Sequence, residues 1–159
     1  MGSNFIDVTE SLATKLELSY SRIDDDEISI DLVGEKSTYE LTVMLRQDYE
    51  IIYFSCDLDL RAGKEKHASI ANAIVRANER IWVGHFDLLS ASNCVAYTFT
   101  VPFMYSFLAD ELVVESIIDL ITVECDRFYH YFLMILENEW PPDTDFSLDA
   151  LFLEAVGEA

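Results

Sequence analysis

Over the first third of the chain, hydrophobic and polar residues alternate with the two-residue period of β-strands. The alternating stretches cover residues 16–23, 27–33, 39–45 and 51–60, and short polar turns separate them. Connections this short join antiparallel neighbours, because a parallel crossover needs a dozen or more residues. The pattern therefore predicts a four-stranded antiparallel β-meander, preceded by a helix that Ser3 or Asn4 can cap.

The second half of the chain predicts two more helices and two more strands. Apolar residues recur every three or four positions from Ile70 to Ile81, which places them on one face of a helix. Two-residue alternation returns over residues 82–90 and 95–103, and the turn between them indicates a second β-hairpin. The longest helical pattern runs over residues 106–139 and ends before two prolines.

This order of elements predicts an α+β fold, in which helices pack on a twisted antiparallel sheet. A length of 159 residues fits one domain, spanning residues 1–159, that can bury a sizeable core. No internal repeat, low-complexity tract or linker divides the sequence.

Five stretches of the sequence, in the same order along the chain, resemble a known family. The longest runs from Asn78 to Leu88 and reads NERIWVGHFDL, and the next runs from Glu124 to Tyr129 and reads ECDRFY. Shorter matches lie at residues 25–28, 54–59 and 156–159. In these stretches the chain resembles the YbjN-like family, labelled putative bacterial sensory transduction regulators, in its form common in alphaproteobacteria.

The resemblance implies a fold similar to that of type III secretion chaperones and a regulatory role. The choice between a secretion chaperone and a signalling regulator stays open, as do the partner and the signal. The chain departs from the family after Tyr129, where relatives usually have a proline and a glycine-rich segment. This chain instead reads HYFLMILENEWPP, so no function is carried over to that segment.

The charge of the chain excludes two classes of partner. Thirty acidic residues against ten basic ones give a formal net charge of −20 at pH 7. Such a surface repels nucleic acid and anionic membranes, because both are bound through lysine and arginine. The longest apolar stretch, residues 112–136, is interrupted by charged residues and predicts no membrane span. With no signal peptide and three cysteines outside any Cys-x-x-Cys motif, we expect a cytoplasmic protein with reduced, buried thiols.

Candidate chemistry is sparse. His85 and Asp87 lie two residues apart on a predicted strand and could form a general base with its orienting carboxylate. The sequence lacks the Gly-x-Ser-x-Gly motif of a serine nucleophile, so we expect no catalytic residue. Asp126 and His130 are one helical turn apart, but no His-x-x-x-His or Cys-x-x-Cys accompanies them. We therefore expect no metal site and no cofactor.

The last part of the long helix predicts a contact with another chain. From Phe128 to Leu136 apolar residues occupy nearly the whole circumference of the helix, whereas packing on one sheet buries an arc of little more than 100°. The surplus predicts a partner-binding surface, most simply that of a homodimer. Its candidate residues are Tyr131, Met134, Ile135 and Trp140. The alternative is that residues 146–156, which are amphipathic at helical spacing, fold back over this surface.

These observations together favour a non-enzymatic regulatory or chaperone-like module that binds protein. The alternative is a small-molecule or metal-dependent enzyme built on His85 and Asp87. The two differ in whether these side chains converge in a pocket or lie on a flat face.

Overall fold

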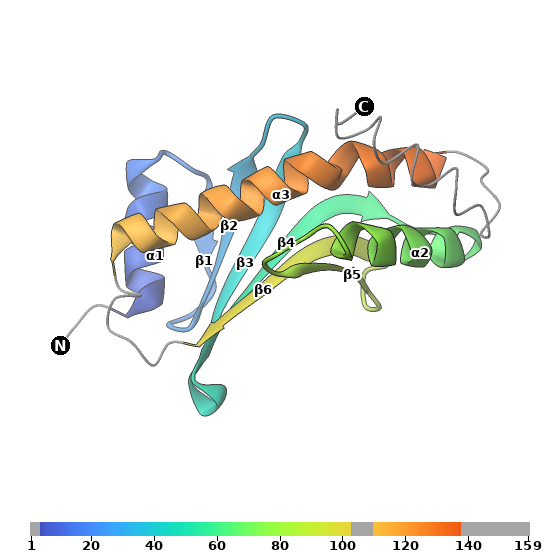
Figure 1. Cartoon of the computed structure of the whole chain (residues 1–159). Coiled ribbons are helices and arrows are strands. Elements are labelled where there is room, and N and C mark those ends of the chain that lie inside the picture. Colours follow the sequence, from blue (N-terminus) through green and yellow to red (C-terminus); the bar gives the residue numbers. More distant parts are fainter. Residues whose placement is uncertain (1–3, 103–109, 138–159) are drawn as a thin grey trace.

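The computed structural model describes residues 4–102 and 110–137, which form three α-helices and six strands (Figure 1). The strands are β1 (Tyr20–Arg22), β2 (Glu27–Val33), β3 (Thr38–Arg46), β4 (Ile51–Arg61), β5 (His85–Leu89) and β6 (Cys94–Pro102). The helices are α1 (Phe5–Lys15), α2 (His67–Asn78) and α3 (Glu111–Glu137), with 3-10 turns η1 (Gln47–Tyr49) and η2 (Lys64–Lys66).

The first helix begins at a capping box. The Asn4 side chain accepts a hydrogen bond from the Asp7 backbone N–H at 2.8 Å, and the Asp7 carboxylate accepts one from the Asn4 N–H at 3.1 Å. Two backbone donors that the first turn of a helix leaves unpaired are satisfied in this way. Asn4 is therefore the cap of the predicted first helix.

The six strands form one antiparallel sheet in the order β1-β2-β3-β4-β6-β5. The predicted meander is confirmed as β1 to β4, and the predicted second hairpin as β5 and β6. It is β6 that pairs with β4, so β5 becomes an edge strand. The α+β fold is thus confirmed, whereas its similarity to type III secretion chaperones stays a prediction.

One face of the sheet carries the core and all three helices (Figure 1). Five side chains that pair across neighbouring strands form the centre of this face, and each is at most 1% exposed. They are Ile30, Leu41, Cys56, Tyr97 and Phe86. The long helix α3 packs on β4 and β6, and it also contacts α1 near its start and α2 along its C-terminal half (Figure 1).

The strand predicted to start at Trp82 begins three residues later, at His85. Helix α2 ends at Asn78, and residues 79–84 form an irregular connection. The Asn78 side chain closes this connection, because its Nδ2 donates to the Phe86 carbonyl at 3.0 Å and its Oδ1 accepts from the Phe86 N–H at 2.7 Å. The prediction failed here because Gly84 adopts a left-handed conformation, with a φ of 68°, which interrupts the extended backbone before His85.

Candidate functional site

His85 and Asp87 do lie on one face of β5, but they engage different neighbours. The His85 Nε2 is 2.9 Å from the Thr98 hydroxyl on β6, and the Asp87 carboxylate accepts from the adjacent Leu88 N–H at 2.8 Å. Both residues are exposed on the side of the sheet that faces away from the helices. The two side chains thus lie on an open face of the sheet, and a catalytic role for them stays the alternative hypothesis.

The predicted partner-binding residues on α3 fall in different environments. Tyr131 and Ile135 are fully buried in the core of this chain, and Met134 is half-buried against it. Trp140 lies outside the described residues. Of the eight apolar residues from Phe128 to Leu136, four are buried and four are half-buried, so the expected surplus surface is exposed only in part, and the homodimer stays a prediction.

Asp126, which with His130 formed the possible zinc-binding pair on α3, accepts hydrogen bonds from the β2–β3 turn instead. The Asp126 carboxylate accepts hydrogen bonds from the Glu35 N–H at 2.9 Å, the Lys36 N–H at 3.1 Å and the Tyr39 hydroxyl at 2.7 Å. It thereby holds the turn between β2 and β3 against α3. Among residues 4–102 and 110–137, no group of three histidine, cysteine or acidic side chains is placed to hold a metal ion.

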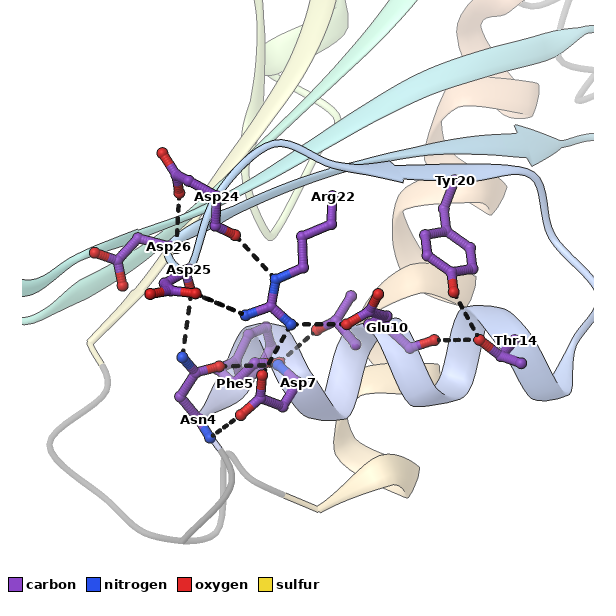
Figure 2. Close-up of polar contacts among 11 residues, drawn as sticks. Asn4, Phe5, Asp7, Glu10, Thr14, Tyr20, Arg22, Asp24, Asp25 and Asp26 are labelled. Carbon is purple, nitrogen blue, oxygen red and sulfur yellow. Dashed lines mark hydrogen bonds and ion pairs between the residues drawn. The ribbon is translucent and has the colours of Figure 1, made fainter. Parts of the chain in front are cut away.

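The acidic run at residues 24–26 belongs to a structural cluster around Arg22 (Figure 2). The Arg22 guanidinium donates to Asp7 at 2.8 Å and to Glu10 at 2.7 Å on α1, and to the backbone carbonyls of Asp24 and Asp25. The hydrogen bond from Arg22, followed by that from the Asn4 N–H, lowers the pKa of the Asp7 carboxyl. The cluster joins α1 to the β1–β2 turn.

A more distinctive surface is formed by residues 79–84, which we call the Trp82 loop. Trp82 is 100% exposed, although the loop around it is held in place on several sides. Asn78 and Phe86 close its base, the Tyr97 hydroxyl donates to the Val83 carbonyl, and Arg127 of α3 donates to the Arg80 carbonyl at 3.4 Å. The indole therefore projects from a fixed support into solvent.

Gly84 allows the loop to return to the sheet. Its φ of 68° lies in the left-handed region, and a Cβ atom there would be 2.5 Å from the Tyr97 hydroxyl and 2.7 Å from the Thr98 carbonyl oxygen. Only glycine combines that conformation with such a close approach at low cost. The sequence pattern placed Trp82 at the start of a predicted strand, although the glycine two residues later could have indicated a turn instead.

The two longest stretches of family resemblance meet at this loop. The Arg127 guanidinium carbon lies 5.0 Å from the centre of the Phe128 ring, and the rings of Phe128 and Phe86 are 5.2 Å apart in an edge-to-face arrangement. These contacts join α3 to the start of β5. The residues that carry the resemblance thus build the support of the Trp82 loop.

Glu124, beside this support, is a largely buried carboxylate whose side chain is 16% exposed. Burial raises its pKa above the ordinary value of 4.5, and the Arg127 guanidinium at 3.8 Å opposes that effect. Burial, followed by the Glu124 charge, also raises the pKa of the Tyr97 hydroxyl, which therefore stays a donor to Val83. The charged form of the buried Glu124 carboxylate therefore destabilises the folded state.

We therefore expect Glu124→Gln to raise the free energy of unfolding at neutral pH. Because the folded state binds the Glu124 proton more tightly than the unfolded chain does, the cost is absent below pH 4.5 and grows as the pH rises through the elevated pKa. Urea denaturation at about pH 4.5 and about pH 8 measures the difference. The matched control is Glu137→Gln, at an exposed position of the same helix. An equal gain at both pH values would show that charge burial is not the cause.

Comparison with known protein families finds a match to one family model. The family described as putative bacterial sensory transduction regulators, YbjN, matches residues 6–134, which is most of the chain. No curated protein matches the sequence significantly. None of the helices in the described ranges is both long and apolar enough to cross a membrane. The match runs from the first turn of α1 to the last turn of α3, and on this basis the chain belongs to the YbjN family.

Proposed function

We propose that this chain is a non-enzymatic cytoplasmic regulator that acts by binding another protein, and that Trp82 is its principal contact residue. The observation that carries the proposal is the complete exposure of a tryptophan on a loop held by side chains from β6 and α3. The family description supports the regulatory part. Three buried free cysteines support the reducing compartment.

The energetics favour recognition through this residue. A tryptophan buries about 150–250 Å² on transfer from water, which at about 25 cal/mol per Å² corresponds to about 4–6 kcal/mol. Because the loop is already ordered, little conformational entropy remains to be lost when a partner covers it. Val83, next to Trp82 in the loop, is 38% exposed, and Val75 on α2 is 58% exposed. Tryptophan is among the residue types most enriched in the hot spots of protein interfaces.

Trp82→Ala is expected to leave the fold intact and to weaken partner binding at least about 30-fold, which corresponds to about 2 kcal/mol. The test is affinity purification from the native cell with wild-type and Trp82→Ala baits, followed by affinity measurement on the recovered partner. Leu112→Ala is the matched control, because Leu112 is 71% exposed and lies about 22 Å along α3 from Arg127. Equal recovery with the Trp82 variant would contradict the proposal.

Fluorescence gives a second measurement. The chain has two tryptophans, so Trp140→Phe leaves Trp82 as the sole indole emitter. Its emission should be that of solvated indole in the free protein and should shift to shorter wavelength when partner is added. Light scattering on the free protein also tests the predicted homodimer. A concentration-dependent blue shift without partner would identify the second copy as the occupant.

The absence of enzymatic activity is part of the proposal. A substrate screen with wild type and His85→Ala tests the alternative enzyme built on His85 and Asp87. Turnover lost in a folded His85→Ala protein would overturn the non-enzymatic assignment.

A further inference from the structure

The face of the sheet opposite the helices has an ordered chemical pattern that the Trp82 loop does not involve. Side chains alternate between the two faces of a strand, so the residues between the core positions point to this side. All three helices of the described chain pack on the other face (Figure 1). We call this surface the helix-free face.

Strand register sorts the helix-free face into three parallel rows. The first is acidic: Asp31 pairs with Glu40 and Glu40 with Asp57, while Asp87 lies on the far side of Ala96 in the same row. The second is made of hydroxyl side chains and ends at the imidazole of β5. Its members are Ser29, Thr42, Ser55, Thr98 and His85. The third is apolar in the middle of the sheet, where Met44 pairs with Tyr53.

The carboxylates of the acidic row have no ion-pair partner in the described residues, and Arg61 is the basic residue that lines the same end of the face. Like charges directly opposite each other on neighbouring strands repel and destabilise the sheet. Within the described ranges, no lysine or arginine forms an ion pair with Asp31, Glu40 or Asp57. Asp57 accepts one local hydrogen bond, from the Asp59 N–H at 2.8 Å. A bound cationic group would relieve this repulsion.

Both ends of the face are hollowed. A hollow of about 380 Å³ at the acidic end is lined by four carboxylates, of Asp31, Glu40, Asp57 and Asp59, and also by Arg61. At the other end, a hollow of about 360 Å³ is lined chiefly by apolar and aromatic groups. They belong to Met44, Tyr49, Ile51 and Tyr53, with the Arg46 guanidinium 5.4 Å from the Tyr49 ring centre.

The distance between the two ends fits an extended peptide. Tyr53 and Asp57 are four residues apart on β4 and share this face, so they are separated by about 13 Å at about 3.3 Å per residue. An extended ligand lying along the strands covers the same distance with four residues. It would place an apolar side chain in one hollow and a basic side chain in the other, and the hydroxyl row lies between them.

The negative charge of the acidic row determines which kind of molecule can bind the helix-free face. A second copy of this chain carries a net charge of −20, and residues 138–159 contain six acids and no lysine or arginine, so both are repelled by the acidic row. Nucleic acid is repelled for the same reason. We propose that the helix-free face is the docking surface for an extended basic segment of a partner protein, with an aromatic or aliphatic residue four positions from a lysine or arginine.

A synthetic probe tests this directly. The probe is a fluorescein-labelled 13-residue peptide of serine and threonine with a central phenylalanine and lysines four and six positions on either side. Fluorescence anisotropy should show binding that weakens as sodium chloride is added, because the lysine–carboxylate attraction is screened. A second peptide with serine in place of the phenylalanine should bind at least about fivefold more weakly, since the apolar hollow then stays empty.

Two double variants with equal charge change locate the site. Glu40→Gln with Asp57→Asn should weaken binding of the probe at least about tenfold, the effect of losing about 1.4 kcal/mol. Glu115→Gln with Asp119→Asn, on α3, should change it less than about threefold, because only the overall charge differs. Equal weakening by the two pairs, or no binding by the wild type at low salt, would overturn the proposal.

The outcome is independent of the proposed role of Trp82. Trp82→Ala should bind the probe as the wild type does, because the Trp82 loop precedes the edge strand β5 and contributes no residue to the acidic or apolar row. Loss of probe binding in Trp82→Ala would place the peptide site at the loop and overturn the assignment to the helix-free face.

Discussion

Gly84→Ala is expected to lower the free energy of unfolding by about 2–5 kcal/mol, the largest effect we predict for a single methyl group. A residue with a side chain costs about 1–2 kcal/mol in the left-handed conformation that Gly84 adopts at φ 68°. The added Cβ would also lie 2.5 Å from the buried Tyr97 hydroxyl and 2.7 Å from the Thr98 carbonyl, and overpacking of this kind costs about 1–3 kcal/mol. Urea denaturation measures the loss.

Gly63→Ala is the matched control for that substitution. Gly63 is exposed, has a φ of −65° and would bring its Cβ only against the flexible carboxylate of Glu65. We expect this variant to stay within about 0.5 kcal/mol of the wild type or to gain slightly, because alanine restricts the unfolded chain. If Gly84→Ala proved equally tolerated, the contact between the Trp82 loop and Tyr97 would not be rigid, and the argument for Trp82 as a preordered contact would weaken with it.

The strands of the meander could be predicted from the sequence because one face of each is buried. A shift of one residue would move Ile28, Ile30 and Leu32 to solvent, so their spacing determines which way β2 faces. The place of β6 between β4 and β5 could not be predicted in the same way. A helix and two loops separate β4 from β5, and a connection of that length permits several strand orders.

The errors around the site have a common cause, which is that contacts distant in sequence override local periodicity. Gly84 takes a left-handed conformation and the Tyr97 hydroxyl donates to the Val83 carbonyl, so the strand starts at His85 and Trp82, which was expected in that strand, is fully exposed. On α3, Tyr131 and Ile135 are buried in the core that the helix forms with the sheet and α2, whereas periodicity alone assigned them to a partner-binding surface. Neither effect is visible before the helices are placed on the sheet.

The function of the resembling stretches was also not evident from their sequence. Asn78 and Gly84 shape the Trp82 loop, Arg127 supports it, and Asp126 holds the β2–β3 turn. These residues form structural contacts, so their occurrence together identifies the fold more directly than it identifies a reaction. The acidic row of the helix-free face, by contrast, becomes apparent only when strand register is known.

Asp126→Ala is expected to lower the free energy of unfolding by about 2–3 kcal/mol, because three donors lose one shared acceptor. Hydrogen bonds to a charged group contribute about 1.5–3 kcal/mol, and a buried donor left without a partner adds a desolvation cost. The Tyr39 side chain is 1% exposed, and burial, followed by its bond to Asp126, raises the pKa of its hydroxyl. The hydroxyl therefore stays a donor and needs the acceptor.

One further variant separates the hydrogen bonds of Asp126 from its charge, and another serves as the control. Asp126→Asn keeps one oxygen for the Lys36 N–H and the Tyr39 hydroxyl but sets an amide donor against the Glu35 N–H, so we expect about half the loss of the alanine variant. Asp119→Ala, two helical turns earlier on an exposed position of α3, should change the free energy of unfolding by less than about 0.5 kcal/mol. Equal losses for Asp126→Ala and Asp119→Ala in urea denaturation would mean that the β2–β3 turn is held to α3 by packing alone.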